Sequence, residues 1–491
     1  MIAKQGLTNG ALADLRVGGV ARPGYDRARV QTGVVHFGPG AFHRAHQASY
    51  LDAALNRDLR WGICEVALHS AGVRDALAPQ DCLYSLSILD ERSSLRIIGC
   101  ITEILVAPES PAAVLVRLAQ PTVHLVTMTI TEKGYCLSPA GGLDFTHADI
   151  QHDLQHPSAP RTIIGFLAEA LRQRRAAGIA PPNILSCDNL ADNGKRLRRA
   201  VLEFSARLDA DLSRWIESTV RFPCSMVDSI TPATDDALRA RVADQLGVTD
   251  RWPIQRELFS QWVIENGMSD PQPDWTSLGV TITDDVAGYE RAKLRLLNGA
   301  HSSLAYLGIL AGYETVSQAM SDATLVAFLT KLMHEDIAPT LHLPEGFDLP
   351  DYGQSILRRF ANPHIRYQLT QIAGDGSQKL PFRLFGTISD TLTSSRPIDR
   401  LCLPVAAWFH FIRRKAKRGE RAIDPLATKL FDIGLACTGN ASRDVQLFLA
   451  LDTVFSTDLR NSTRLAILLA QAYEQLSAVT NSVELAAVIG K

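Results

Sequence analysis

Three side chains suited to proton transfer or to hydrogen bonding with a substrate lie within one short segment, Lys293-Leu-Arg-Leu-Leu-Asn298-Gly-Ala-His301. On an α-helix of about 100° per residue, His301 lies about 80° from Lys293 and Asn298 lies about 140° from it. All three can therefore line one broad face, which is otherwise apolar. Apolar surroundings disfavour the charged form of a lysine and lower its pKa. The segment therefore predicts a general acid/base that works near neutral pH.

The two other polar side chains of this segment suit the same chemistry. The amide of Asn298 can donate a hydrogen bond to the oxygen of a developing alkoxide, and His301 can hydrogen-bond a substrate hydroxyl. A structural interpretation competes with this one. In it, Lys293 reaches the surface, Asn298 lies at a kink beside Gly299, and His301 is a core histidine with its hydrogen bonds satisfied. The residues of the segment leave both interpretations open.

Further polar side chains directly follow two apolar runs that are typical of strands. Asp188 and Asn189 follow "NILSC", and Asp228 ends "FPCSMVD". Ligands of open α/β sheets bind beyond the carboxyl ends of the strands, which makes these residues candidates for a site. Helix capping and turn formation are the structural alternatives.

A glycine-rich turn lies near the N-terminus, where the apolar run "GVVHF" meets Gly38-Pro39-Gly40 and a helical pattern follows. Glycines there let the backbone approach a pyrophosphate, and the following helix presents free N–H groups. Such sites also use an acidic residue at the end of the second strand, and Glu65 in "WGICEVAL" has about the expected spacing. Glu65 could equally lie inside the strand and point away from a ligand. His43 stands in place of the third glycine, so the motif could equally be a strand–helix turn without a ligand. The candidate cofactor-binding residues are Phe37, Gly38, Gly40, Ala41, Phe42 and Glu65.

The pattern of apolar residues changes near residue 284. Before it, apolar runs such as "LRIIGC", "TVHLVTMTI" and "STVRFPCSMV" alternate with amphipathic helical segments such as "IIGFLAEALRQRRAAG". This alternation predicts a parallel sheet covered by helices. After it, the periodicity is almost entirely helical. We therefore expect an α/β domain over residues 1–284 and a helical domain over residues 285–491.

Composition excludes several classes of function. The chain of 491 residues has a formal net charge of -2, which offers no field to capture nucleic acid or a membrane surface. Its 8 cysteines form no C-x-x-C pair and lie mostly in apolar runs, so we expect buried thiols in a reducing compartment and no metal site. With no signal peptide and no run of about 18 apolar residues, we expect a cytoplasmic protein.

Taken together, these segments resemble the long-chain polyol dehydrogenases, the family of the mannitol 2-dehydrogenases and the fructuronate reductases (mannonate oxidoreductases). The matching strings run from about residue 34 to residue 384. They are "HFGPGAFHRAHQASYLD", "WGICEV", "TITEKGYC", "SCDNLADNG", "FPCSMVDSITP", "QWVIEN", "KLRLLNGAHSSLAYLG" and "DGSQKLPFR".

The resemblance implies a Rossmann-type NAD(P)-binding domain followed by a helical substrate domain, with the active site between them. It implies metal-independent hydride transfer at a secondary alcohol or ketone, and a monomer or weak dimer. Lys293 corresponds to the general acid/base, Asn189 and Asn298 to the pair that holds the reacting oxygen, and His301 to a substrate-orienting residue. The remaining carried-over positions are Asp228 and Lys379, which line the site, and Glu290, which gates proton exit.

Within the family, the sequence favours the hexuronate branch. Mannitol 2-dehydrogenases carry an arginine at the position of Gln371, whereas fructuronate reductases have glutamine there and an arginine corresponding to Arg366. Arg366 or Arg383 could pair with a hexuronate carboxylate. Against this, Ser229 replaces the usual arginine after Asp228. We therefore expect D-fructuronate and D-mannonate as substrates, with mannitol and fructose as the alternative.

The residues after the second strand bear on the choice between NAD and NADP. Mannitol enzymes place acidic residues after the second strand, where they repel a 2′-phosphate, and this chain has Ala71 and Gly72 there. We expect NAD as the cofactor, with NADP not excluded.

Overall fold

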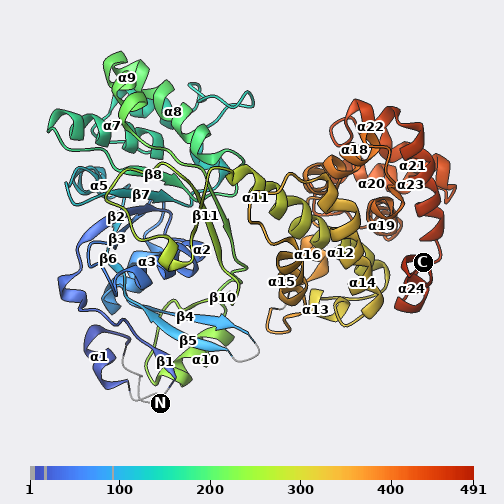
Figure 1. Cartoon of the computed structure of the whole chain (residues 1–491), viewed down its shortest axis with the longest axis horizontal. Coiled ribbons are helices and arrows are strands. Elements are labelled where there is room, and N and C mark those ends of the chain that lie inside the picture. The colour runs from blue at the N-terminus through green and yellow to red at the C-terminus, as the bar shows by residue number, and fades with distance from the viewer. Residues whose placement is uncertain (1–5, 16–18, 91–92, 366, 491) are drawn as a thin grey trace. The chain divides into compact units, whose positions relative to one another are not determined.

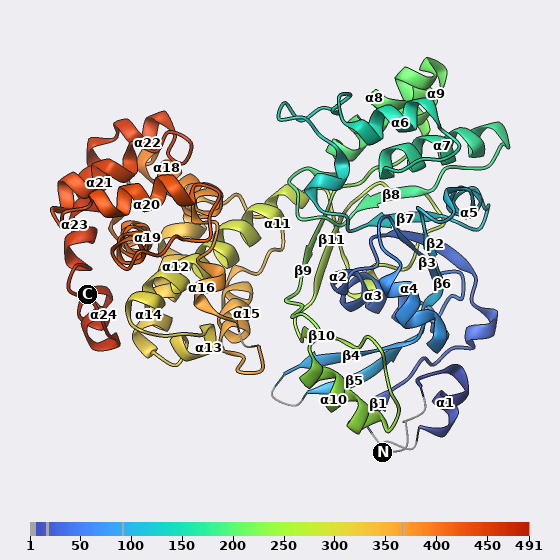
Figure 2. The same cartoon turned by 180° about the vertical axis from the view of Figure 1, so that it is seen from behind.

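Residues 6–15, 19–90, 93–365 and 367–490 are described by the structure, which is a computed structural model. The chain divides into two units, Met1–Ala287 and Gly288–Lys491. Figures 1 and 2 show the first unit in blue to yellow-green and the second in yellow to red.

Five parallel strands form the central sheet of the first unit. In spatial order they are β6 (Ile101–Val106), β3 (Gly62–Ala67), β2 (Thr32–Phe37), β7 (Leu125–Met128) and β8 (Asn183–Ser186). The first strand of the set along the chain, β2, lies in the middle, and the chain winds outward from it in both directions. This is the doubly wound order of a dinucleotide-binding fold, and its crevice opens where β2 and β7 lie side by side.

Helices cover both faces of this sheet. Helices α5 (Pro111–Leu118), α7 (Ile163–Ala176) and α8 (Asn193–Leu208) lie on one face, and α3 (Gln47–Ala54) lies on the other (Figures 1 and 2). Because side chains alternate along a strand, neighbouring residues supply two separate cores: Val35 packs on the α7 side and Val34 on the α3 side. Burial on both faces is the reason that the strands read as continuous apolar runs.

Two smaller sheets complete the first unit. One has the order β1 (Val20–Ala21), β5 (Ser94–Ile98), β4 (Tyr84–Leu89), β10 (Ile254–Glu257), and the other has the order β12 (Thr281–Thr283), β11 (Gln261–Glu265), β9 (Ser225–Asp228). We expected β5 and β9 in the main parallel sheet, and that expectation is wrong. Strand β5 pairs antiparallel with β4, because the connection between them is too short for the crossover that a parallel pair needs.

The second unit is helical, and its described residues contain no strand beyond one isolated bridge between Thr315 and Gln368. The long helix α19 (Asp399–Lys417) packs against α12 (Asn298–Leu310), α20 (Ala427–Ala436) and α23 (Thr463–Gln475). An α/β Rossmann-type fold followed by a mostly helical domain is thus confirmed.

Glu65 does not occupy the place that we expected for it. We expected it at the end of the second strand, where it could hold ribose hydroxyls. It lies inside β3 instead, and 0% of its surface is exposed, so its carboxylate is closed off from such a ligand. Nε2 of the buried His43 lies 3.4 Å from Oε1 of Glu65.

Burial sets the ionisation of this pair. It raises the pKa of Glu65 to about 7, against the opposing effect of Arg44, and lowers the pKa of His43 to about 3. At neutral pH the histidine is therefore uncharged, and the contact is not an ion pair.

Glu65 should make the stability of the fold depend on pH. Its pKa is higher in the folded state than the ordinary 4.5. The stabilisation from its bound proton is therefore complete below about pH 4.5 and is lost as the pH rises through about 7, by about 3 kcal/mol at most. Urea unfolding of Glu65→Gln at pH 5.5 and pH 8.5 should show a flatter dependence than the wild type. The exposed Glu474→Gln should keep the wild-type slope; equal slopes in all three proteins would contradict this account.

Candidate active site

The turn after β2 has the backbone that a phosphate-binding loop needs. Gly38 has φ +95°, and a Cβ there would lie 2.2 Å from the carbonyl oxygen of Thr129, so only glycine fits. A Cβ on Gly40 would meet nothing nearer than the carbonyl oxygen of Gly38 at 3.9 Å, which leaves open space over the turn. The turn lies at the carboxyl end of the central strand, beside β7. These features fit the pyrophosphate of a dinucleotide.

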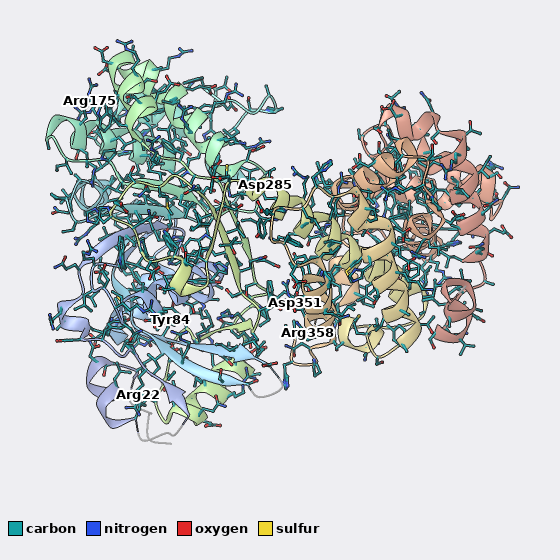
Figure 3. The ribbon with its side chains drawn as sticks, in the orientation of Figure 1. Arg22, Tyr84, Arg175, Asp285, Asp351 and Arg358 are labelled. Carbon is teal, nitrogen blue, oxygen red and sulfur yellow. The ribbon has the colours of Figure 1, made fainter. Side chains whose placement is uncertain are left out.

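The residues around this turn have unequal access to a ligand. Phe37 is fully buried and packs against Phe166, with ring centroids 5.8 Å apart, so only its backbone is available. Ala41 and Phe42, at the start of α2 (Ala41–Ala45), are half-buried. Arg44 is buried further along α2, where its carbonyl oxygen accepts a hydrogen bond of 2.7 Å from the hydroxyl of Tyr84, labelled in Figure 3.

Asp188 holds the loop that follows β7. Its carboxylate accepts hydrogen bonds from the backbone N–H groups of Ile130 (3.1 Å) and Thr131 (2.8 Å) and from the hydroxyl of Tyr135 (2.6 Å). Burial raises the pKa of Asp188, and these three donors act against that rise. The next residue, Asn189, is exposed just beyond the carboxyl end of β8. Asp188 thus fixes this loop, and Asn189 follows it directly.

Asn193 joins the end of β8 to β9, a role that sequence reasoning missed. Its Nδ2 donates to the carbonyl oxygens of Asp188 (3.0 Å) and Ser225 (2.7 Å), and its Oδ1 accepts from the N–H of Ser225 at 3.0 Å. The side chain is fully buried. This clamp fixes the start of β9, and the buried Asp228 is the last residue of that strand.

In the second unit, the helix that carries Lys293 contains a π turn over Lys293–Leu297, between α11 (Val286–Ala292) and α12. The backbone N–H of Asn298 bonds the carbonyl oxygen of Lys293, five residues back. One extra residue in a turn rotates the helix beyond it by about 100° relative to a continuous α-helix. The expected 140° separation is therefore wrong: Asn298 comes to about 40° from Lys293, and His301 to about 20° on the other side.

The π turn thus gathers three candidates on one narrow face. Lys293, Asn298 and His301 are all half-buried. The ring of His301 stacks on Phe360 at 4.7 Å and lies 5.6 Å from the ring of Tyr367. Glu290, at the end of α11, is also half-buried.

A second π turn, Pro381–Phe385, contacts the first one. Proline lacks the N–H that an α-helix needs and its ring crowds the preceding turn, which explains the widening here. Lys379, just before it, donates to the carbonyl oxygen of Gly374 at 2.7 Å and lies 3.6 Å from Asp375. Burial, followed by the charge of Arg383, lowers the pKa of Lys379.

Arg383 lies within this second π turn. Its Nη1 donates to Ser302 Oγ on α12 at 3.0 Å, and it forms no ion pair with any residue that the structure describes. Burial lowers the pKa of its guanidinium. Gln371, in α16 (Leu369–Ile372), is exposed, whereas Arg366 lies outside the described residues.

Two kinds of feature are absent from the described ranges. No group of three or more His, Cys, Asp or Glu side chains could hold a metal ion. No described helix is both long and apolar enough to cross a membrane.

Both units match models of one protein family. The mannitol dehydrogenase Rossmann domain matches residues 32–277, and the mannitol dehydrogenase C-terminal domain matches residues 285–477. D-mannonate oxidoreductase of Escherichia coli is 40% identical over 467 residues, which are 93% of this chain and 96% of the relative. Mannitol 2-dehydrogenase of Phaeosphaeria nodorum is 37% identical over 468 residues, which are 93% of this chain and 81% of the relative.

Solved structures give the same result. Pseudomonas fluorescens mannitol 2-dehydrogenase, in a ternary complex with NAD and D-mannitol, is 38% identical with a TM-score of 0.82, covering 99% of this chain and 100% of its own. D-sorbitol dehydrogenase in substrate-free form is 32% identical with a TM-score of 0.90, covering 98% of this chain and 100% of its own. The chain therefore belongs to the mannitol dehydrogenase family of oxidoreductases.

Proposed function

We propose that this protein is an NAD(P)-dependent oxidoreductase that interconverts D-fructuronate and D-mannonate, with no metal in the reaction. The observation that carries the proposal is the π turn Lys293–Leu297, because it turns an amine and an amide toward the same side of one helix. That arrangement suits a carbonyl oxygen that gains negative charge and then a proton.

The glycine turn and its neighbours would hold the cofactor. Gly38 and Gly40 leave room for the pyrophosphate, and the backbone of Phe37, Ala41 and Phe42 borders the same turn. When bound, the nicotinamide supplies or accepts the hydride. NAD is the proposed form, as in the ternary complex of the mannitol 2-dehydrogenase relative. The proposal also includes NADP, because Ala71 and Gly72 carry no carboxylate that would repel its 2′-phosphate.

Four side chains would act on the reacting group. The amides of Asn298 and Asn189 donate hydrogen bonds to the reacting oxygen, and His301 orients a neighbouring hydroxyl. Lys293 gives its proton to that oxygen during reduction, and its neutral amine takes the proton back during oxidation. Glu290, one helical turn before Lys293, passes the proton to water.

The choice of a sugar acid rests on charge. Arg383 is a half-buried cation that forms no ion pair with a described residue. It donates a hydrogen bond to Ser302 on α12, the residue that follows His301. A substrate carboxylate can complete its hydrogen bonds. Gln371, where mannitol enzymes have arginine, agrees with this assignment, and so does the 40% identity to a D-mannonate oxidoreductase. Asp228 and Lys379 would bind the sugar hydroxyls, with Arg366 as a second cation. The alternative is a mannitol 2-dehydrogenase, given the relatives at 37% and 38% identity.

Substrate preference tests the proposal directly. We expect purified protein to oxidise NADH faster with D-fructuronate than with D-fructose at equal concentration, as followed by absorbance. Lys293→Ala should lower kcat for the preferred substrate by about 10²- to 10⁴-fold, the usual contribution of a general acid/base. Faster turnover of fructose would favour the mannitol alternative, and an unaffected Lys293→Ala would overturn the role of the lysine.

Two further variants test which side chains recognise the substrate carboxylate. Arg383→Gln should raise KM for D-fructuronate by about tenfold or more while changing KM for D-fructose little, because only the sugar acid has a carboxylate to lose its partner. Gln371→Arg should improve kcat/KM for fructose relative to fructuronate. Equal losses with both substrates in Arg383→Gln would show that the arginine does not read the carboxylate.

A further inference from the structure

His36 lies directly beneath the glycine turn and contacts it from inside the sheet. It is fully buried near the end of β2, and its ring bridges to the end of β7. Nδ1 lies 2.7 Å from Thr127 Oγ1, while Nε2 lies 3.1 Å from the carbonyl oxygen of Gly38 and 3.1 Å from Thr129 Oγ1. The proposed reaction gives this side chain no role.

The partners of His36 fix its tautomer. A carbonyl oxygen can only accept, so Nε2 must carry the proton that it shares with Gly38. Burial, reinforced by His43, lowers the pKa of His36, so the ring holds a single proton and Nδ1 is an acceptor. The hydroxyl of Thr127 therefore donates to Nδ1. Thr129 Oγ1 in turn donates to the carbonyl oxygen of Gly38 at 3.0 Å.

These contacts hold both backbone polar groups of Gly38. The carbonyl oxygen of Gly38 accepts from His36, from Thr129 and from the N–H of Gly40 at 2.7 Å. The N–H of Gly38 donates to the carbonyl oxygen of Val66 at 3.0 Å. Such anchoring holds Gly38 at its positive φ and aims the N–H groups that follow it.

The same ring also supports the helix after the turn. His36 stacks on His43 of α2, with ring centroids 3.3 Å apart and planes 12° from parallel. Nε2 of His43 in turn lies 3.4 Å from the buried carboxyl group of Glu65, and Arg44, the next residue along α2, is buried as well. One side chain thus contacts the strand, the turn and the helix that together make the loop.

We propose that His36 is a positioning residue for dinucleotide binding: it holds the Gly38 peptide and the start of α2 in the conformation that the cofactor needs. The inference rests on the proposed use of a dinucleotide, and it assigns His36 no contact with the cofactor or the substrate.

The test measures binding and backbone motion rather than turnover. His36→Leu removes every hydrogen bond of the ring, His36→Gln keeps a donor and an acceptor, and Thr129→Val removes one donor to Gly38 without changing shape. The matched control is His410→Leu. His410 is also buried, donates from Nε2 to the carbonyl oxygen of Tyr473 at 2.8 Å and stacks on that ring at 3.9 Å, but it lies in the second unit.

We expect His36→Leu to weaken NADH binding, measured by fluorescence titration, by about tenfold or more. Amide hydrogen exchange in the peptide that spans residues 37–45 should speed up in the same variant. His36→Gln should recover most of both properties, and Thr129→Val should show a smaller loss of the same kind. His410→Leu should lower Tm while leaving NADH binding and exchange in this peptide unchanged.

The outcomes separate the two proposals. Wild-type protein that binds no NADH or NADPH would overturn the proposed function, and this inference with it. Wild-type binding together with unchanged binding and exchange in folded His36→Leu would overturn the role of His36 alone. If His36→Leu does not fold, unchanged binding and exchange in folded His36→Phe, which also lacks every hydrogen bond of the ring, would have the same meaning.

Discussion

The geometry of the helix that carries Lys293 depends on one backbone hydrogen bond, from the N–H of Asn298 to the carbonyl oxygen of Lys293. It closes a turn one residue wider than an α-helical turn. Without that extra residue, Asn298 would point about 100° away from its present direction. Wide turns of this kind are rare and frequently lie at functional sites. In the proposed reaction, this widening would let the amine of Lys293 and the amide of Asn298 act on one oxygen.

The surrounding helices fit this turn closely. A Cβ on Gly299 would lie 3.0 Å from the carbonyl oxygen of Arg383, so the two π turns approach each other through a glycine. Arg295, inside the first π turn, bonds Asp390 at 2.6 Å and Thr340 Oγ1 at 3.1 Å. In the first unit, buried polar side chains fix the backbone in a similar way. Asp188 and Asn193 hydrogen-bond loops to strand ends, and these bonds fix the backbone on both sides of Asn189. In each unit, buried polar groups hold the exposed ones in place.

The sequence was sufficient for the architecture and insufficient for its local irregularities. Apolar runs marked β2, β3, β7 and β8 because strands buried on both faces must be apolar throughout. The same logic failed for β5, since an apolar run does not say which sheet a strand joins. The π turns were missed because a wide turn needs no particular residue; Pro381 was the one signal available, and Lys293–Leu297 has none. Glu65 shows a third limit: spacing placed it near a strand end, whereas only the register places it opposite His36 inside the sheet.

The most direct test of the account is chemical rescue of Lys293→Ala by added primary amines. If Lys293 is the general acid/base, small amines such as methylamine should restore part of kcat for mannonate oxidation in proportion to their free-base concentration. Rescue should also depend on the pKa of the amine. Guanidine-like cations without a titratable amine should restore nothing. Wild-type activity in the unrescued variant, or equal rescue by amines and by guanidinium, would contradict the central role of Lys293.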